Sequence, residues 1–127
     1  MVSIEWVILC KNAQEDVDGL LCIDGIIDTF TVPEVPISGH CTIVFRLRGN
    51  PNQEVELRIE LRGPPGTWLA EIPPATITIN ENGLAVNSVA ARLPFAQPGR
   101  YELRVFANEQ TCVLPFTVEL SSPTVVH

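Results

Sequence analysis

The stretch FAQPGRYELRVFAN, residues 95–108, decides the fold. Pro98 and Gly99 form a turn signal, Tyr101 follows, and apolar and charged residues then alternate as far as Ala107. This period-two alternation is typical of a half-buried strand. A tyrosine at the start of such a strand can bury its ring and direct its hydroxyl back to the backbone of the turn. We therefore predict a structural corner between two strands, with no catalytic role.

The rest of the chain repeats this pattern of short strands and turns. Eleven prolines and eight glycines are spread along the 127 residues, and helical periodicity is missing. Strands at this spacing, without helices, favour an all-β fold, an antiparallel β-sandwich. The alternation predicts about eight strands, or nine if residues 68–79 are interrupted: Ile4–Cys10, Leu20–Val32 with a bend at Gly25, His40–Arg48, Glu54–Arg62, Trp68–Ile79, Leu84–Phe95, Tyr101–Ala107 and Thr111–Leu120.

The same alternation predicts which side chains face inward and which face solvent. Residues 54–62 place Val, Leu and Ile on one face and charged residues on the other. Arg46 and Arg48 are expected to face those charges across an antiparallel pair, as a ladder that serves solubility and register. The predicted core comprises Trp6, Ile8, Ile23, Phe45, Leu57, Ile59, Leu93, Leu103, Val105 and Phe116.

Length and hydropathy indicate one cytoplasmic domain, residues 1–120, followed by a flexible tail, residues 121–127. The longest apolar run, Trp6–Cys10, is much shorter than a membrane span, and the N-terminus lacks the features of a signal peptide. The net charge is −7, and residues 1–40 hold seven acidic side chains against Lys11 alone. Because nucleic acids and anionic membranes attract basic surfaces, neither is an expected partner.

The cysteines carry no metal or redox motif. Cys10, Cys22, Cys41 and Cys112 include no C-x-x-C pair, so we expect no zinc and mostly free, buried thiols. Cys10 and Cys22 flank one predicted hairpin and are the only pair with a sequence argument for being neighbours.

Two pairs of residues are candidates for catalysis, and neither pair has suitable geometry. His40 and Cys41 are adjacent on a predicted strand, where neighbouring side chains point to opposite faces. Asp24 and Asp28 lie four residues apart, roughly 13 Å along a strand, too far for an acid–base pair. We therefore expect the protein not to be an enzyme and to have no cofactor.

The loop QEDVDG, residues 14–19, is the one candidate for a cation. Glu15, Asp16 and Asp18 could supply oxygen ligands to calcium, as the loops of a C2-like sandwich do. An ordinary Asp-Gly turn explains the same residues, and calcium needs a second acidic loop that the sequence does not provide.

Three motifs resemble a family of small bacterial proteins of unknown function. They are an apolar first strand ending in Cys10, a Gly25–Asp28 run of the G-[IV]-[FI]-D type, and the P-G-x-Y sequence at Pro98–Tyr101. The resemblance extends from about residue 8 to 118 and implies no catalytic residue. Tyr101 also resembles the corner tyrosine of immunoglobulin-like sandwiches, which implies a Greek-key topology, although Leu103 stands where antibody domains have a cysteine.

These observations predict a non-catalytic module that binds another protein or a copy of itself. The first strand, SIEWVILC, lacks the lysines and prolines that blunt sheet edges, so Trp6 and Val7 are the expected centre of an interface. The alternative is a sandwich that binds a small ligand or calcium through residues 14–19.

Overall fold

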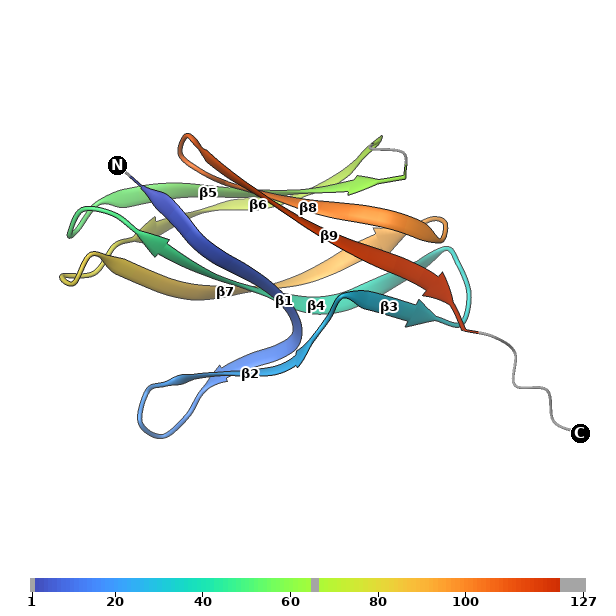
Figure 1. The fold of residues 1–127 in the computed structure, drawn as a ribbon, viewed down its shortest axis with the longest axis horizontal. Coiled ribbons are helices and arrows are strands. Elements are labelled where there is room, and N and C mark those ends of the chain that lie inside the picture. Colours follow the sequence, from blue (N-terminus) through green and yellow to red (C-terminus); the bar gives the residue numbers. More distant parts are fainter. Residues whose placement is uncertain (1, 65–66, 122–127) are drawn as a thin grey trace, which may run out of the picture.

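A computed structural model describes residues 2–64 and 67–121, which form nine strands and no helix. The prediction of an all-β chain is confirmed. Two sheets pack against each other (Figure 1), one with the order β2-β1-β4-β7 and the other with the order β3-β9-β8-β5-β6. Apart from Ser121, the predicted tail lies outside the described residues. The strands are β1 (Ser3–Glu15), β2 (Leu21–Ile26), β3 (Thr29–Val32), β4 (Ile37–Arg48), β5 (Glu54–Gly63), β6 (Thr67–Thr78), β7 (Leu84–Phe95), β8 (Gly99–Ala107) and β9 (Gln110–Leu120).

The strand predicted at residues 20–32 is divided between the two sheets. Gly25 has a positive φ of 67°, which a residue with a Cβ adopts only under strain, and a Cβ there would lie 2.9 Å from the side chain of Lys11. The chain leaves β2 after this point, and Ile27 donates a hydrogen bond to the Leu9 carbonyl at 2.7 Å. It then enters β3, which pairs with β9 in parallel. One sheet is therefore mixed, so the prediction of an all-antiparallel sandwich is wrong at this pair of strands. The ninth strand results from this division, and not from an interruption of residues 68–79.

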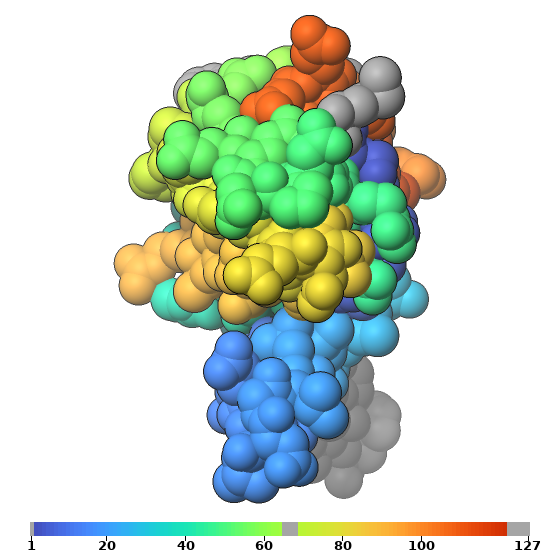
Figure 2. Space-filling view, turned by 90° about the vertical axis from the view of Figure 1, so that its left-hand side faces the viewer, coloured from blue at the N-terminus to red at the C-terminus, as the bar shows by residue number. Residues whose placement is uncertain are grey.

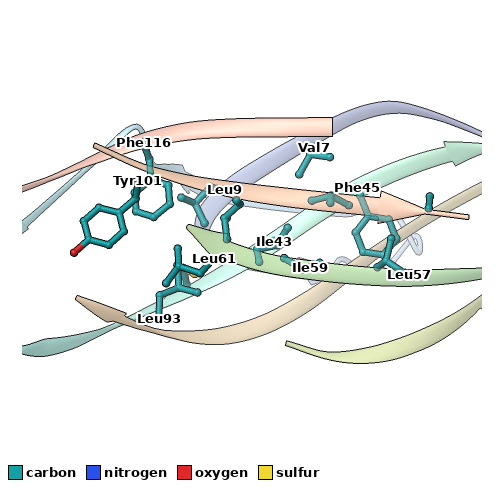
Figure 3. Close-up of a cluster of buried hydrophobic side chains, with 14 of the residues drawn as sticks. Val7, Leu9, Ile43, Phe45, Leu57, Ile59, Leu61, Leu93, Tyr101 and Phe116 are labelled. Atoms are coloured by element: carbon teal, nitrogen blue, oxygen red, sulfur yellow. The ribbon is translucent and has the colours of Figure 1, made fainter. Parts of the chain in front are cut away.

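The core lies between the sheets, where side chains from β1, β4 and β7 meet those from β5, β8 and β9 (Figure 3). Seven of the ten predicted core residues are fully buried, because the alternation in their strands runs without interruption: Phe45, Leu57, Ile59, Leu93, Leu103, Val105 and Phe116. The other three, Trp6, Ile8 and Ile23, are only half-buried.

The first strand presents the opposite face to the one predicted. Val7 and Leu9 point into the core, and Trp6 and Ile8 lie on the outer face. The pairing register between β1 and β4 shifts between Ile4 and Trp6. An extra residue at such a bulge exchanges the two faces of all the residues beyond it. The placement of Trp6 and Ile8 in the core is therefore wrong.

The charge ladder forms between strands other than the predicted ones, because β4 and β5 belong to different sheets. Arg46 and Arg48 bind Glu5 on β1, with N–O distances of 2.9 and 3.4 Å. The hydrogen bond from Arg46, helped by Arg48, lowers the pKa of the exposed Glu5 carboxyl. The charges of β5 are compensated within their own sheet: Glu60 binds Arg62 at 3.1 Å, and its register neighbour on β8 is Arg104.

Tyr101 forms the predicted corner. Its hydroxyl donates a hydrogen bond to the Gln97 carbonyl at 2.6 Å, and the residue is 1% exposed. The ring stacks on Phe116 and meets Phe95 edge-on, with centroid distances of 5.6 and 5.3 Å. Phe95 comes from one sheet, whereas Tyr101 and Phe116 come from the other, so this cluster joins the two sheets.

The four cysteines are free thiols. Cys10 lies opposite Ile26 and Cys22 opposite Gln14, so the two are four positions apart along the hairpin and are not neighbours as expected. Burial raises the pKa of the Cys41 thiol to about 11, and burial also raises the pKa of Cys10 and of Cys112. These three thiols are therefore protonated at neutral pH.

Tyr101→Phe should reduce the free energy of unfolding by about 1 kcal/mol, because it removes the bond to the Gln97 carbonyl at 2.6 Å and a longer one from the Gln97 N–H at 3.4 Å, and keeps the ring packing. Urea unfolding followed by tryptophan fluorescence would measure the change. Gln97→Ala is the comparison: it leaves the accepting backbone carbonyl in place and removes only the exposed side-chain hydrogen bond to the Pro64 carbonyl, so it should change the free energy of unfolding less. An unchanged midpoint in Tyr101→Phe would show that the hydroxyl bond does not stabilise the corner.

The free energy of unfolding should fall as the pH rises from about 9 to about 11. The folded pKa of Cys41 is raised above the 9.0 of a free thiol, so its stabilising contribution is complete below pH 9 and is lost as the pH approaches 11. Urea titrations across this range should give a shallower pH dependence for Cys41→Ala than for the wild type. Cys22→Ala, at an exposed position, should keep the wild-type slope, and equal slopes in all three proteins would contradict the assignment.

Candidate functional site

The most prominent surface feature is a hairpin that projects from the sandwich (Figure 2). It is formed by residues 11–26, the end of β1 with β2, and is called the arm below. β1 pairs with β4 only as far as Cys10, opposite Thr42, and beyond this point it pairs with β2 alone. β2 has no other strand neighbour. A two-stranded hairpin without further support is marginally stable in water, so a contact with another surface would stabilise the arm.

The tip of the arm is built by Asp16. One oxygen of its carboxylate accepts hydrogen bonds from the backbone N–H groups of Asp18 and Leu20, both at 2.9 Å. The N–H of Gly19, at a positive φ of 77°, donates to the Asp16 carbonyl at 3.0 Å. Asp16 therefore has a structural role, which supports the reading of QEDVDG as a turn.

The residues of the tip do not form a cation site with others. Among residues 2–64 and 67–121, no three His, Cys, Asp or Glu side chains come together in a way that could hold a metal ion. Glu15 and Asp18 are exposed on the projecting tip, away from any second acidic loop of the described chain. No observation favours the calcium alternative.

One face of the arm carries three apolar side chains, with Lys11 and Glu15 on the same face. Ala13 lies opposite Ile23, and Leu21 follows on the same face opposite Glu15. These positions continue the face of β1 that carries Leu9 into the core, but the second sheet has no strand paired there to cover them. The three apolar residues are half-buried, and Ile23, predicted as a core residue, lies here for this reason.

The arm also exposes apolar side chains at its tip and at its base. Val17 and Leu20 are 101% and 64% exposed at the tip, and Ile26 is 73% exposed where the arm meets the sandwich. Isolated exposed apolar residues are common, but these three belong to the same hairpin as the apolar face. The arm is therefore much more apolar on its surface than a solvated hairpin needs to be.

The arm is acidic around this apolar face. Lys11 and the carboxylates of Glu15, Asp16, Asp18 and Asp24 give it a net charge of −3, out of −7 for the whole chain. Within the described residues, none of these four carboxylates forms an ion pair. An apolar strip with free negative charges beside it has the chemistry of a surface that binds an apolar patch bordered by basic residues.

The interface expected on the first strand, at Trp6 and Val7, stays a prediction. β1 pairs with β4 from Ser3 to Cys10 and with β2 only from Cys10 to Glu15, so its first part has a strand neighbour on one side only, as an edge does. Val7 is 9% exposed and belongs to the core. Trp6 is half-buried on the outer face, beside Arg46.

The two catalytic candidates lie apart, as their spacing indicated. His40 is exposed and Cys41 is buried, on opposite faces of β4. Asp24 lies opposite Asn12 in the arm, whereas Asp28 precedes β3, and its carbonyl accepts a hydrogen bond from Thr117 at 3.0 Å. Neither pair has the proximity that nucleophilic or acid–base catalysis requires.

A shallow hollow of about 420 Å³ lies where β5 and β6 meet the turn between β8 and β9. Its lining residues include two carboxylates from the outer face of β5 that the sequence did not indicate as a site, and they are Glu54, Glu56, Pro74, Ala75, Thr76 and Asn108. Asn108 is held in place by the Glu56 backbone, with N–O distances of 3.0 and 3.1 Å. This lining contains no nucleophile with a neighbouring base.

Comparison with known structures gives the fold alone. A β-glucosidase from Listeria innocua, in crystal structures with glucose and with isofagomine, is similar to this chain with TM-scores of 0.54 and 0.51. Sequence identities are 7% and 10%, and the alignments cover 94% and 93% of this chain. This chain spans 16% of the glucosidase. At this sequence identity, the similarity in fold does not imply that this chain has the activity of the glucosidase.

Sequence comparison identifies the family and no activity. No curated protein matches the chain. Among the described residues, no helix has the length and hydropathy needed to cross a membrane. The model of a protein family described as a family of unknown function, DUF6941, matches residues 5–119, as the sequence motifs indicated. The chain therefore belongs to the DUF6941 family.

Proposed function

We propose that this protein is a non-catalytic protein-interaction module that binds its partner through the arm. The observation that carries the proposal is a hairpin with an apolar face and free carboxylates that the sandwich leaves unsupported. The partner fitted by this chemistry is another protein with an apolar patch bordered by lysine or arginine. The acidity of the arm argues against nucleic acid and against an anionic membrane.

The architecture supports an interaction module of the immunoglobulin-like class, which we infer from topology. The strands β1-β4-β7 have the order of A-B-E in such sandwiches, and β9-β8-β5-β6 have the order of G-F-C-C′. Tyr101 then lies at the start of the strand equivalent to F, where the corner tyrosine belongs. The arm is an insertion between the first strand and β3. Four free thiols fit a reducing compartment, and we place the protein in the cytoplasm.

A second copy of the chain is a poor partner for the arm. Five of its seven arginines already bind carboxylates of the same chain: Arg46, Arg48, Arg58, Arg62 and Arg104. The sandwich surface therefore offers few free basic groups to an acidic hairpin. A different protein is the partner that charge complementarity favours.

The arm should crosslink to a partner in the source cells. We would place a photoreactive phenylalanine analogue at Ile23, on the apolar face, and irradiate intact cells. The expected result is a discrete covalent adduct with one other protein. The control position is Val113, which is 48% exposed on β9 and should give no such adduct.

Matched charge variants then test the acidic part of the proposal. Asp18→Asn with Asp24→Asn should lower the adduct yield about fivefold to tenfold, because two attractive charges are lost. Glu54→Gln with Glu109→Gln changes the net charge equally on the sandwich and should have no effect. The absence of an adduct from position 23, or the same adducts from position 113, would refute the arm as the binding element.

A further inference from the structure

The four outermost strands of the two sheets differ in how well their edges are protected. β2 belongs to the arm and carries Asp24, β3 has four residues and is followed by Pro33, and β6 contains Pro73 and Pro74. Short length, charge and proline are the devices that keep edge strands from pairing with other chains. β7 has twelve residues, and Arg92 is its only charged side chain. Among these four outermost strands, β7 is thus the one that lacks such protection from Leu84 to Ala91, with Arg92 and Pro94 only near its end.

The edge of β7 is also accessible. Val86 is 42% exposed, and Asn87, Ser88 and Ala90 are exposed as well. β7 pairs with β4 along its whole length, so half of its backbone N–H and C=O groups point away from the sheet. These groups are available for hydrogen bonds to one more strand.

We propose that β7 pairs in antiparallel orientation with β7 of a second copy of the chain. Two four-stranded sheets would then form one continuous eight-stranded sheet across a twofold axis. Because side chains alternate between faces, the axis must pass through a residue so that outward positions meet outward positions. With the axis at Ser88, the two Ser88 side chains face each other, and Val86 of each copy faces Ala90 of the other.

Charge complementarity selects a second copy over an unrelated peptide. Arg92 lies near the end of β7, and Glu81 lies in the turn that precedes its start. Neither forms an ion pair within the described residues. In the Ser88 register, Arg92 of one copy lies opposite Leu84 of the other, three residues from Glu81. The symmetry produces this pairing of opposite charges at both ends of the interface, and residues 82–91 contain no charge that would oppose it.

The outer face of the sheet is compatible with this arrangement. Ile8, Val44 and Ser88 lie side by side across β1, β4 and β7, and Val44 is fully buried among its neighbours although it lies outside the core. The row contains no charged side chain. Pairing at β7 extends it across the axis without bringing like charges together.

Sedimentation velocity of the full chain from about 5 µM to about 500 µM tests the proposal. The wild type is expected to form a dimer with twice the mass of the 13.9 kDa chain. Ser88→Lys places two lysines opposite each other on the axis and should weaken the dimer at least about tenfold. Val113→Lys adds the same charge on β9, in the other sheet, and should leave the dimer intact. Circular dichroism checks that each variant is folded.

A charge exchange tests the orientation and register. Arg92→Glu and Glu81→Arg should each weaken the dimer about fivefold to tenfold, since each places like charges together at both ends. The double variant should restore wild-type affinity, which neither a folding defect nor pairing with a foreign peptide would produce. A monomeric wild type at the highest concentration, a dimer that tolerates Ser88→Lys, or a double variant without rescue would overturn the proposal. The arm is not involved, so these results are independent of the crosslinking outcome.

Discussion

The hydrogen bond from Tyr101 to the Gln97 carbonyl fixes the turn by which the chain passes from β7 in one sheet to β8 in the other. β7 ends at Phe95 in the first sheet, and β8 begins at Gly99 in the second, so three residues make the crossing. With the hydroxyl held at this turn, the ring lies between Phe95 and Phe116. The distance between the sheets at this end is set by that stack.

The same aromatic cluster constrains the strands around it. Phe30 of β3 packs on both Phe95 and Phe116, with centroid distances of 5.0 and 5.5 Å. Gly39 of β4 lies against the Phe95 ring so closely that a Cβ there would clash with it. The glycine is required for packing, since its backbone is in ordinary extended conformation. β3 therefore reaches the second sheet because its phenylalanine fills a place that the corner creates.

Alternation predicts the inside of a strand well when the strand is regular. Leu57, Ile59, Leu103 and Val105 lie on such strands, and their burial could be predicted from sequence alone. One bulge reverses the result for Trp6 and Ile8, and no local sequence signal marks a bulge of this kind. Alternation also cannot predict which strands pair with each other, because pairing depends on which strands share a sheet. For this reason the sequence predicts that β4 and β5 carry outward-facing charges but pairs these charges with each other, although the two strands lie in different sheets.

The candidate site was predictable in composition and not in shape. The excess of acidic residues before residue 40 was evident, and the turn at Asp16–Gly19 was one of two explanations for it. That the hairpin projects depends on where pairing with β4 ends, at Cys10, and on the departure of the chain at Gly25. These are tertiary properties. Ile23 illustrates the consequence: it follows the pattern of a core residue on a strand that extends beyond the core.

The arm and the outer edge of β7 lie at opposite ends of the same sheet, so both surfaces can be occupied at the same time. β1 and β4 separate β2 from β7 in the sheet, and the arm also extends beyond Cys10, where pairing with β4 ends. A partner on the arm therefore does not occupy the backbone groups of β7, and pairing at β7 does not cover the apolar face at Ile23. In a twofold pair, the two arms lie at the two far edges of the continuous sheet. Such an assembly would present two separated acidic hairpins, so a partner with two basic patches would bind it more tightly than it binds one chain, provided that its patches match the span between the arms.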